Sequence, residues 1–142
     1  LRRPILSQRF HHLLWNIKSA RVIFQAGLKI DSTLGFNNRI CEKHELLNPF
    51  KIKTDKIALW EFPIAIQDVA LKKQYKSFDK CKLAICKLLD DCEELEIRPT
   101  FLWHNNYRKN SLEVRLYEFL LKELHERGFK GAALTHIDYG DQ

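Results

Sequence analysis

Hydrophobic side chains recur three and four positions apart in three segments of the chain, and this spacing predicts three amphipathic helices. The first helix follows Asn16, a residue type that caps helices well, and runs to about Ala26. Gly27 then suits the left-handed turn at which helices end. The second helix follows Ser77. Its apolar face, which we expect to lie against a core, consists of Phe78, Cys81, Ile85, Leu88, Cys92 and Leu95.

The third predicted helix begins at Asn110 or Ser111 and ends at Gly128. Glu113 stands near its start and basic residues stand near its end, which is the arrangement that the helix dipole favours. Its apolar face consists of Leu116, Leu120 and Leu124.

Short apolar runs follow each predicted helix within a few residues, at 28–30, 100–103 and 131–134. A further run at 58–66 contains Pro63, which predicts a bent or edge strand because proline lacks the N–H that a sheet ladder needs. Helices that alternate with short apolar strands predict right-handed crossovers and a mainly parallel sheet. The expected fold class is therefore α/β.

The chain has 142 residues, of which 45% are hydrophobic, and this is enough for a single domain over residues 1–142 with a buried core. Residues 35–57 form a long polar stretch, the kind of loop that often walls a binding site. The chain contains no methionine and begins at Leu1. We therefore expect it to be a segment of a longer protein.

Basic residues are concentrated at the start of the chain. Six of them precede the first acidic residue, Asp31, and they account for the whole net charge of +6, because the remaining basic residues equal the 18 acidic ones. Few aromatic residues lie among them, so a solvated surface or contact with an acidic segment is favoured over a nucleic-acid interface.

The four cysteines form no C-x-x-C pair, and their spacing predicts buried, reduced thiols rather than a zinc site or a disulfide framework. They are Cys41, Cys81, Cys86 and Cys92. The apolar runs are too short to cross a membrane, and the apolar start is too short for a secretion signal. These features favour a cytoplasmic location and predict no membrane partner.

Polar side chains stand where the predicted strands end, and the carboxyl ends of parallel strands meet at one edge of a sheet. The groups, in chain order, are Arg9, His11 and His12; Asp31, Ser32 and Thr33; Gln67 and Asp68; His104, Asn105 and Asn106; and residues 135–138. His104 is the strongest candidate, because it stands where an apolar strand ends and is followed by two amide side chains, Asn105 and Asn106. His11 and His12 are adjacent on an extended segment, so we expect one to be buried and the other exposed.

Four motifs occur in a recognisable order: RFHHL at 9–13, IDSTLGF at 30–36, LWEFPIAIQD at 59–68 and LWHN at 102–105. This order resembles the later part of polysaccharide deacetylase-like proteins with the NodB-homology domain, a carbohydrate esterase family. The resemblance covers most of residues 1–110. It implies part of a distorted (β/α) barrel of mostly parallel strands, and metal-dependent hydrolysis of acetyl groups from carbohydrate in the intact protein.

The resemblance implies catalytic roles for three residues. His104 matches the histidine that protonates the departing amine or hydroxyl, Asp31 the aspartate that pairs with it, and Arg9 the arginine that orients the catalytic base. Each also has a plainer interpretation. His104 alone fits a residue that caps a strand, Asp31 one that opens a turn, and Arg9 one that belongs to the basic surface.

Three further residues are candidates for binding the carbohydrate substrate. Asp68 stands at a strand end, where it can contact sugar hydroxyls, and Asn105 follows the motif histidine. Trp103 either stacks on a sugar ring or, as an aromatic residue in an apolar strand, packs within the core.

The base and metal-binding motifs of the family belong before Arg9 and are absent from this chain. We therefore expect no metal site in this segment, a divalent, zinc-like metal only in the intact protein, and no activity from the segment alone. Besides carbohydrate, the expected partner is the missing N-terminal part of the same barrel. A loop motif usual after the IDSTLGF segment is also missing at 37–41, so a non-catalytic remnant that binds glycan or protein is the alternative.

Overall fold

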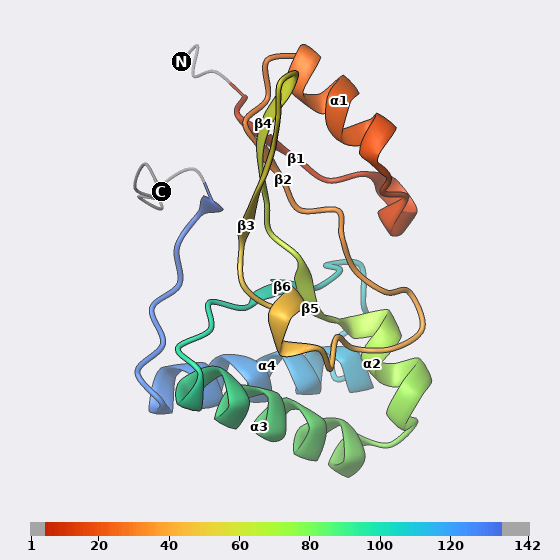
Figure 1. The fold of residues 1–142 in the computed structure, drawn as a ribbon. Helices are drawn as coiled ribbons and strands as arrows, with labels where there is room; N and C mark the ends of the chain where they lie inside the picture. Colours follow the sequence, from red (N-terminus) through yellow and green to blue (C-terminus); the bar gives the residue numbers. More distant parts are fainter. Residues whose placement is uncertain (1–4, 135–142) are drawn as a thin grey trace.

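The computed structural model describes residues 5–134 and shows a mixed α/β fold in which parallel strands alternate with helices (Figure 1). In this part of the chain the strands form two sheets, one of order β1-β2-β4-β3 and one of β5 and β6. The strands are β1 (Ser7–Gln8), β2 (Ile30–Asp31), β3 (Phe50–Thr54), β4 (Ile57–Glu61), β5 (Ile64–Gln67) and β6 (Thr100–Leu102).

Most strand pairs are parallel, as the sequence predicts. β2 pairs in parallel with both β1 and β4, and β5 pairs in parallel with β6, whereas β3 and β4 form an antiparallel hairpin. Within the described residues the two sheets do not close into a barrel.

Pro63 separates β4 from β5 inside the run that predicts a bent strand. The N–H of Phe62 still donates to Asp31 O in the first sheet (2.8 Å), whereas the N–H of Ile64 donates to Leu34 O (2.7 Å). Proline has no N–H for a ladder, so the break falls at this residue. The predicted bend is confirmed, and it carries the chain from the first sheet to the second.

The three predicted helices are confirmed, and their ends are capped as the sequence indicates. Their bounds are Ile17–Gln25 (α1), Phe78–Glu94 (α3) and Leu112–Glu126 (α4). The side chains of Asn16, Ser77 and Ser111 accept hydrogen bonds from backbone N–H groups in the first turns. Gly27 and Gly128 adopt φ values of 82° and 76°, where a side chain would be strained.

The larger core lies where α3 and α4 pack against each other and against the second sheet, in the lower half of Figure 1. Its helical members include the predicted residues Cys81, Ile85, Leu88, Cys92, Leu116 and Leu120. Leu95 is 47% exposed, because α3 ends one residue before it. A smaller core joins α1 to β4 through Ala20, Ile23, Ile57 and Leu59.

Three predictions about secondary structure are wrong. Residues 131–134 form no strand, and the polar stretch 35–57 contains β3 and a short 3₁₀ turn, His44–Leu46. A helix, α2 (Asp68–Tyr75), follows β5 where none was predicted. Its apolar residues are adjacent in sequence, so they produce no periodic signal.

The thiols are unpaired, with Cys41, Cys81 and Cys92 buried and Cys86 partly exposed. The predicted burial is therefore confirmed for three of the four thiols. Among the described residues, none of the helices combines the length and the apolar character needed to span a membrane.

Candidate functional site

Asp68 and His104 meet where β5 and β6 end. These parallel strands pair at Gln67 and Leu102, so the residues just beyond them lie side by side. His104 Nδ1 lies 2.8 Å from Asp68 Oδ1, and the His104 backbone N–H donates to Asp68 Oδ2 at 3.0 Å. The strand register therefore places an imidazole directly against a carboxylate.

Asp68 is 1% exposed, and several donors hold its carboxylate in place. The N–H of Val69 donates to Oδ1 at 2.8 Å, in addition to the two contacts from His104. Burial, and then a hydrogen bond to Asp68, raises the pKa of the Tyr107 hydroxyl. The Tyr107 ring also lies edge-on to His104, with 6.4 Å between ring centroids. An ionised carboxylate only accepts hydrogen bonds, so the proton of the neutral imidazole belongs on Nδ1.

His104 opens onto a cleft of about 530 Å³. The side chain of His104 is 43% exposed, and Nε2 is the ring nitrogen not bound to Asp68. The cleft is also lined by Arg9, His11, His12, Gln67 and Lys73. Residues that follow three different predicted strands, at 9–12, at 67 and at 104, thus line one cavity.

A strained turn, His11–Leu13, forms part of the lining of the cleft. His12 and Leu13 have φ values of 59° and 53°, a conformation that costs energy for residues other than glycine. Asn37 Nδ2 holds the turn by donating to His12 O at 2.8 Å, and the turn closes with Leu13 N–H donating to Phe10 O.

Both histidines of this turn are exposed, and their ring centroids are 3.9 Å apart. The expectation that one is buried is wrong, because it assumed an extended segment with alternating sides. A left-handed residue removes that alternation, so His11 and His12 both line the cleft.

Arg9 joins the cleft to a buried acidic pair. Its Nε donates to Ser32 O (2.7 Å) and its Nη2 to Ser32 Oγ (2.8 Å). Burial lowers the pKa of Arg9 and the charge of Asp31 raises it, but a guanidinium stays charged in either case. Arg9 is therefore held by the segment after β2 and does not lie free on a basic surface.

Asp31 and Glu61 are both fully buried, side by side on the paired strands β2 and β4. Asp31 Oδ1 accepts hydrogen bonds from Gln8 Nε2 (2.6 Å), from Thr33 Oγ1 (2.6 Å) and from the Ser32 N–H (2.9 Å). Glu61 Oε1 accepts a hydrogen bond from the backbone N–H of Leu34 at 2.9 Å. The second oxygens, Asp31 Oδ2 and Glu61 Oε2, are buried and have no hydrogen-bond partner among the described residues.

Burial, and then the charge of Asp31, raises the pKa of Glu61 to about 8. Glu61 is therefore protonated at neutral pH and can donate its proton to Asp31. The two carboxyls thus hold one proton between them, because two negative charges side by side in a buried site would be unfavourable.

The structure gives His104 a different carboxylate partner from the one expected. Asp68, rather than Asp31, binds its Nδ1, and the hydrogen bonds of Asp31 go to Gln8, Ser32 and Thr33. The local bonds to the two following residues match the turn interpretation of Asp31. A direct contact between Asp68 and sugar hydroxyls does not fit a carboxylate that is 1% exposed.

The other two candidate substrate-binding residues do not line the His104 cleft. Asn105 is exposed. Trp103 is half-buried, donates from Nε1 to Glu113 O at 3.1 Å and packs on Tyr117 with 5.6 Å between ring centroids. Of its two interpretations, packing is the one that these contacts match.

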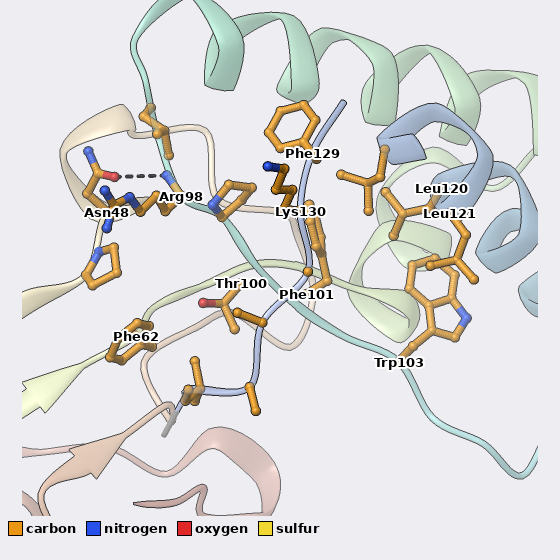
Figure 2. Close-up of a pocket in the computed structure, with 18 of the residues that line it drawn as sticks. Asn48, Phe62, Arg98, Thr100, Phe101, Trp103, Leu120, Leu121, Phe129 and Lys130 are labelled. Carbon is orange, nitrogen blue, oxygen red and sulfur yellow. Dashed lines mark hydrogen bonds between the residues drawn. The ribbon is translucent and has the colours of Figure 1, made fainter. Parts of the chain in front are cut away.

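Trp103 lines a separate groove of about 1310 Å³ between the sheets, α4 and residues 129–134. Figure 2 shows Trp103 beside Leu120 and Leu121 at one end, with Asn48 and Arg98 at the other. A hydrogen bond from the Arg98 N–H to Asn48 Oδ1 (3.1 Å) ties that end together. Most of the groove's lining is apolar or aromatic.

The sequence interpretation did not single out Glu61, although a carboxyl within the apolar run 58–66 is an unusual signal. It considered Tyr107 only as an aromatic residue that could stack on a sugar ring, and nothing in the sequence predicts the interaction of its hydroxyl with Asp68. The predicted strand-end group at 135–138 lies outside the described residues.

Within residues 5–134, no three His, Cys, Asp or Glu side chains are arranged to hold a metal ion. Comparisons with protein-family models, with curated proteins and with solved structures find no match to this chain.

Proposed function

We propose that this chain supplies the leaving-group side of a site that hydrolyses acetyl groups from carbohydrate. The observation that carries the proposal is the Asp68–His104 pair, held at the ends of two parallel strands and open to a cleft. The order of the four sequence motifs supports the choice of reaction, since His104 occupies the position that the resemblance gives to the general acid.

The chemistry follows from the arrangement of the ring nitrogens. Departure of an amine or alkoxide from an acetyl carbon requires a proton, and a protonated His104 donates it from Nε2, the nitrogen not bound to Asp68. The Asp68 carboxylate fixes the ring orientation and stabilises the imidazolium before transfer. General acid catalysis of this kind contributes about 10²–10⁴ in rate.

Asp68 takes the pairing role that the resemblance assigned to Asp31, and Arg9 remains at the cleft with the buried pair behind it. We assign Asp68 as a positioning residue, because it acts through His104. For Arg9, which lines the cleft, we keep the role that the resemblance implies, orientation of a catalytic base that the upstream part would supply.

The open sheets support the proposal that further strands complete a barrel. Among the described residues the outer strands, β1 and β3 in the first sheet and β5 and β6 in the second, each pair on one side only, so both edges of each sheet are unpaired. The apolar groove lies between the same two sheets. Unpaired strand edges and a wide apolar groove are surfaces that folded proteins normally cover. The upstream part of the same barrel is our proposed partner for them.

Acetate release from acetylated amino-sugar oligomers tests the proposal. We expect none from residues 1–142 alone and measurable release from a longer form that includes the upstream motifs. In the longer form, His104→Gln should reduce the rate about 10²-fold or more, whereas His125→Gln, at an exposed position on α4, should not change it. Release by the chain alone contradicts the division of the site, and an unchanged rate for His104→Gln contradicts the acid role.

A further inference from the structure

We propose that the cleft beside His104 binds an acidic carbohydrate. Its carboxylate or phosphate would lie against Arg9 and Lys73, and one of its hydroxyls against Gln67. The identification of the ligand as a carbohydrate rests on the proposed function. The preference for an anion rests on the cleft alone.

The charges that face the cleft are of one sign. Arg9 and Lys73 carry positive charge, and the imidazoles of His11 and His12 add further N–H donors. No carboxylate is among the described side chains that line the cavity. Two buried carboxyl groups stand behind the lining, Asp68 against His104 and Asp31 near Arg9. A negatively charged group in this cleft therefore meets N–H donors, and none of the described lining side chains is a carboxylate that would repel it.

The basic side chains retain donors for a ligand. Among residues 5–134, Lys73 Nζ makes one hydrogen bond, to Asn37 O at 3.3 Å, and an ammonium group has three N–H donors. Arg9 uses Nε and one Nη2 hydrogen on Ser32, and within the same residues the other donors of its guanidinium make no further hydrogen bond. A guanidinium presents such donors in the geometry that matches carboxylate and phosphate oxygens.

The turn that carries His11 and His12 is strained and is held from outside. The left-handed conformation at His12 persists because Asn37 binds its carbonyl and because Leu13 packs near Gly35, where an added Cβ would lie 3.2 Å from Leu13 Cδ1. Strain that the surroundings hold in this way is concentrated at binding and catalytic sites. Here its result is that both imidazoles line the cleft.

Gln67 gives an independent indication of a ligand. It is 7% exposed and lines the cleft, yet its Oε1 is buried without a hydrogen-bond partner among the described residues. A buried acceptor without a partner costs about 1–3 kcal/mol, so a donor is expected there. A carboxylate or a fully ionised phosphate monoester has no proton to give, whereas a sugar hydroxyl has one. The basic side chains and Gln67 together thus favour a molecule that carries both an acid group and a hydroxyl.

The size of the cleft is consistent with this ligand. Its volume of about 530 Å³ lies within the range of small-molecule sites, about 300–1,000 Å³. One or two sugar units can therefore occupy it beside His104.

Calorimetric titration of the whole chain tests the inference with four probes: glucuronate, glucose 6-phosphate, glucose and inorganic phosphate. We expect both acidic sugars to bind at least tenfold more tightly than glucose, and also more tightly than inorganic phosphate. Equal affinity for glucose and the acidic sugars, or no binding by either acid, overturns the anion site. Phosphate binding as tight as that of glucose 6-phosphate overturns the carbohydrate part.

Matched lysine variants locate the site. Lys73→Gln should weaken binding of the acidic sugars about fivefold and leave glucose unchanged. Lys87→Gln removes the same charge from an exposed position on α3 that does not line the cleft, and it should change neither. Identical effects of the two variants contradict the assignment, provided both have the unfolding temperature of the parent chain. Because binding is measured without turnover, a failure here is distinct from a failure to release acetate.

Discussion

Replacing Glu61 by glutamine tests whether a proton is held between the buried carboxyls of Glu61 and Asp31. Glutamine has nearly the same shape as protonated glutamate. Its carbonyl oxygen can accept the Leu34 N–H and its amide can donate to the Asp31 carboxyl, so glutamine can make the interactions of a protonated Glu61 without a titratable proton. The variant therefore removes one pH dependence and leaves the packing in place.

The sign of the effect follows from the raised pKa of Glu61. In the unfolded chain this carboxyl loses its proton near its ordinary value of 4.5, whereas in the folded protein it does so at about 8. The stabilisation is thus complete below about pH 4.5, decreases as the pH rises from there, and is lost once the pH passes about 8. Within this window each pH unit costs about 1.4 kcal/mol, so the native protein should lose about 2 kcal/mol between about pH 6 and about pH 8.

Urea unfolding, followed by circular dichroism at those two pH values, measures the change. We expect the free energy of unfolding of Glu61→Gln, relative to the native chain, to rise by about 2 kcal/mol from the lower pH to the higher. Histidines and thiols titrate in both proteins, so the difference isolates Glu61. Glu118→Gln, at an exposed position on α4, serves as the control and should follow the native curve. Parallel curves for the native protein and Glu61→Gln would refute the shared proton.

Two other predictions concern the turn and the core. Asn37→Ala removes the hydrogen bond to His12 O and should lower the free energy of unfolding by about 1 kcal/mol, with NMR shifts at the turn that the neighbouring exposed Asn38→Ala does not produce. Equal effects of both variants would contradict a turn held by Asn37. Leu88→Ala, 4% exposed on α3, should cost about 2–5 kcal/mol in chemical unfolding, whereas Leu83→Ala, 69% exposed on the same helix, should change stability by less than about 0.5 kcal/mol.

The helices were predictable because their signals are local. Ser77 and Ser111 cap α3 and α4, and the apolar spacing identifies the buried faces. α2 was missed because Val69, Ala70 and Leu71 are consecutive, and β3 because its five residues include three exposed polar ones. Both short elements depend on neighbours that are distant in sequence for their stability.

The site was predictable in its residues but not in its pairing. His104 follows from its place at the end of an apolar strand, and Asp31 and Asp68 both stand at strand ends as well. Only the register of β5 against β6 decides which carboxylate meets the imidazole, and it selects Asp68. Register depends on tertiary packing, which no local pattern in this chain specifies.

The central claim is that Asp68 holds the Nδ1 proton of His104 and leaves Nε2 facing the cleft, and ¹⁵N NMR of the imidazole tests it most directly. At a pH where the ring is neutral, the native chain should show His104 protonated at Nδ1, and Asp68→Ala should return it to the Nε2-protonated form that free histidine favours. A native His104 already protonated at Nε2, with a spectrum unchanged in Asp68→Ala, would contradict the account.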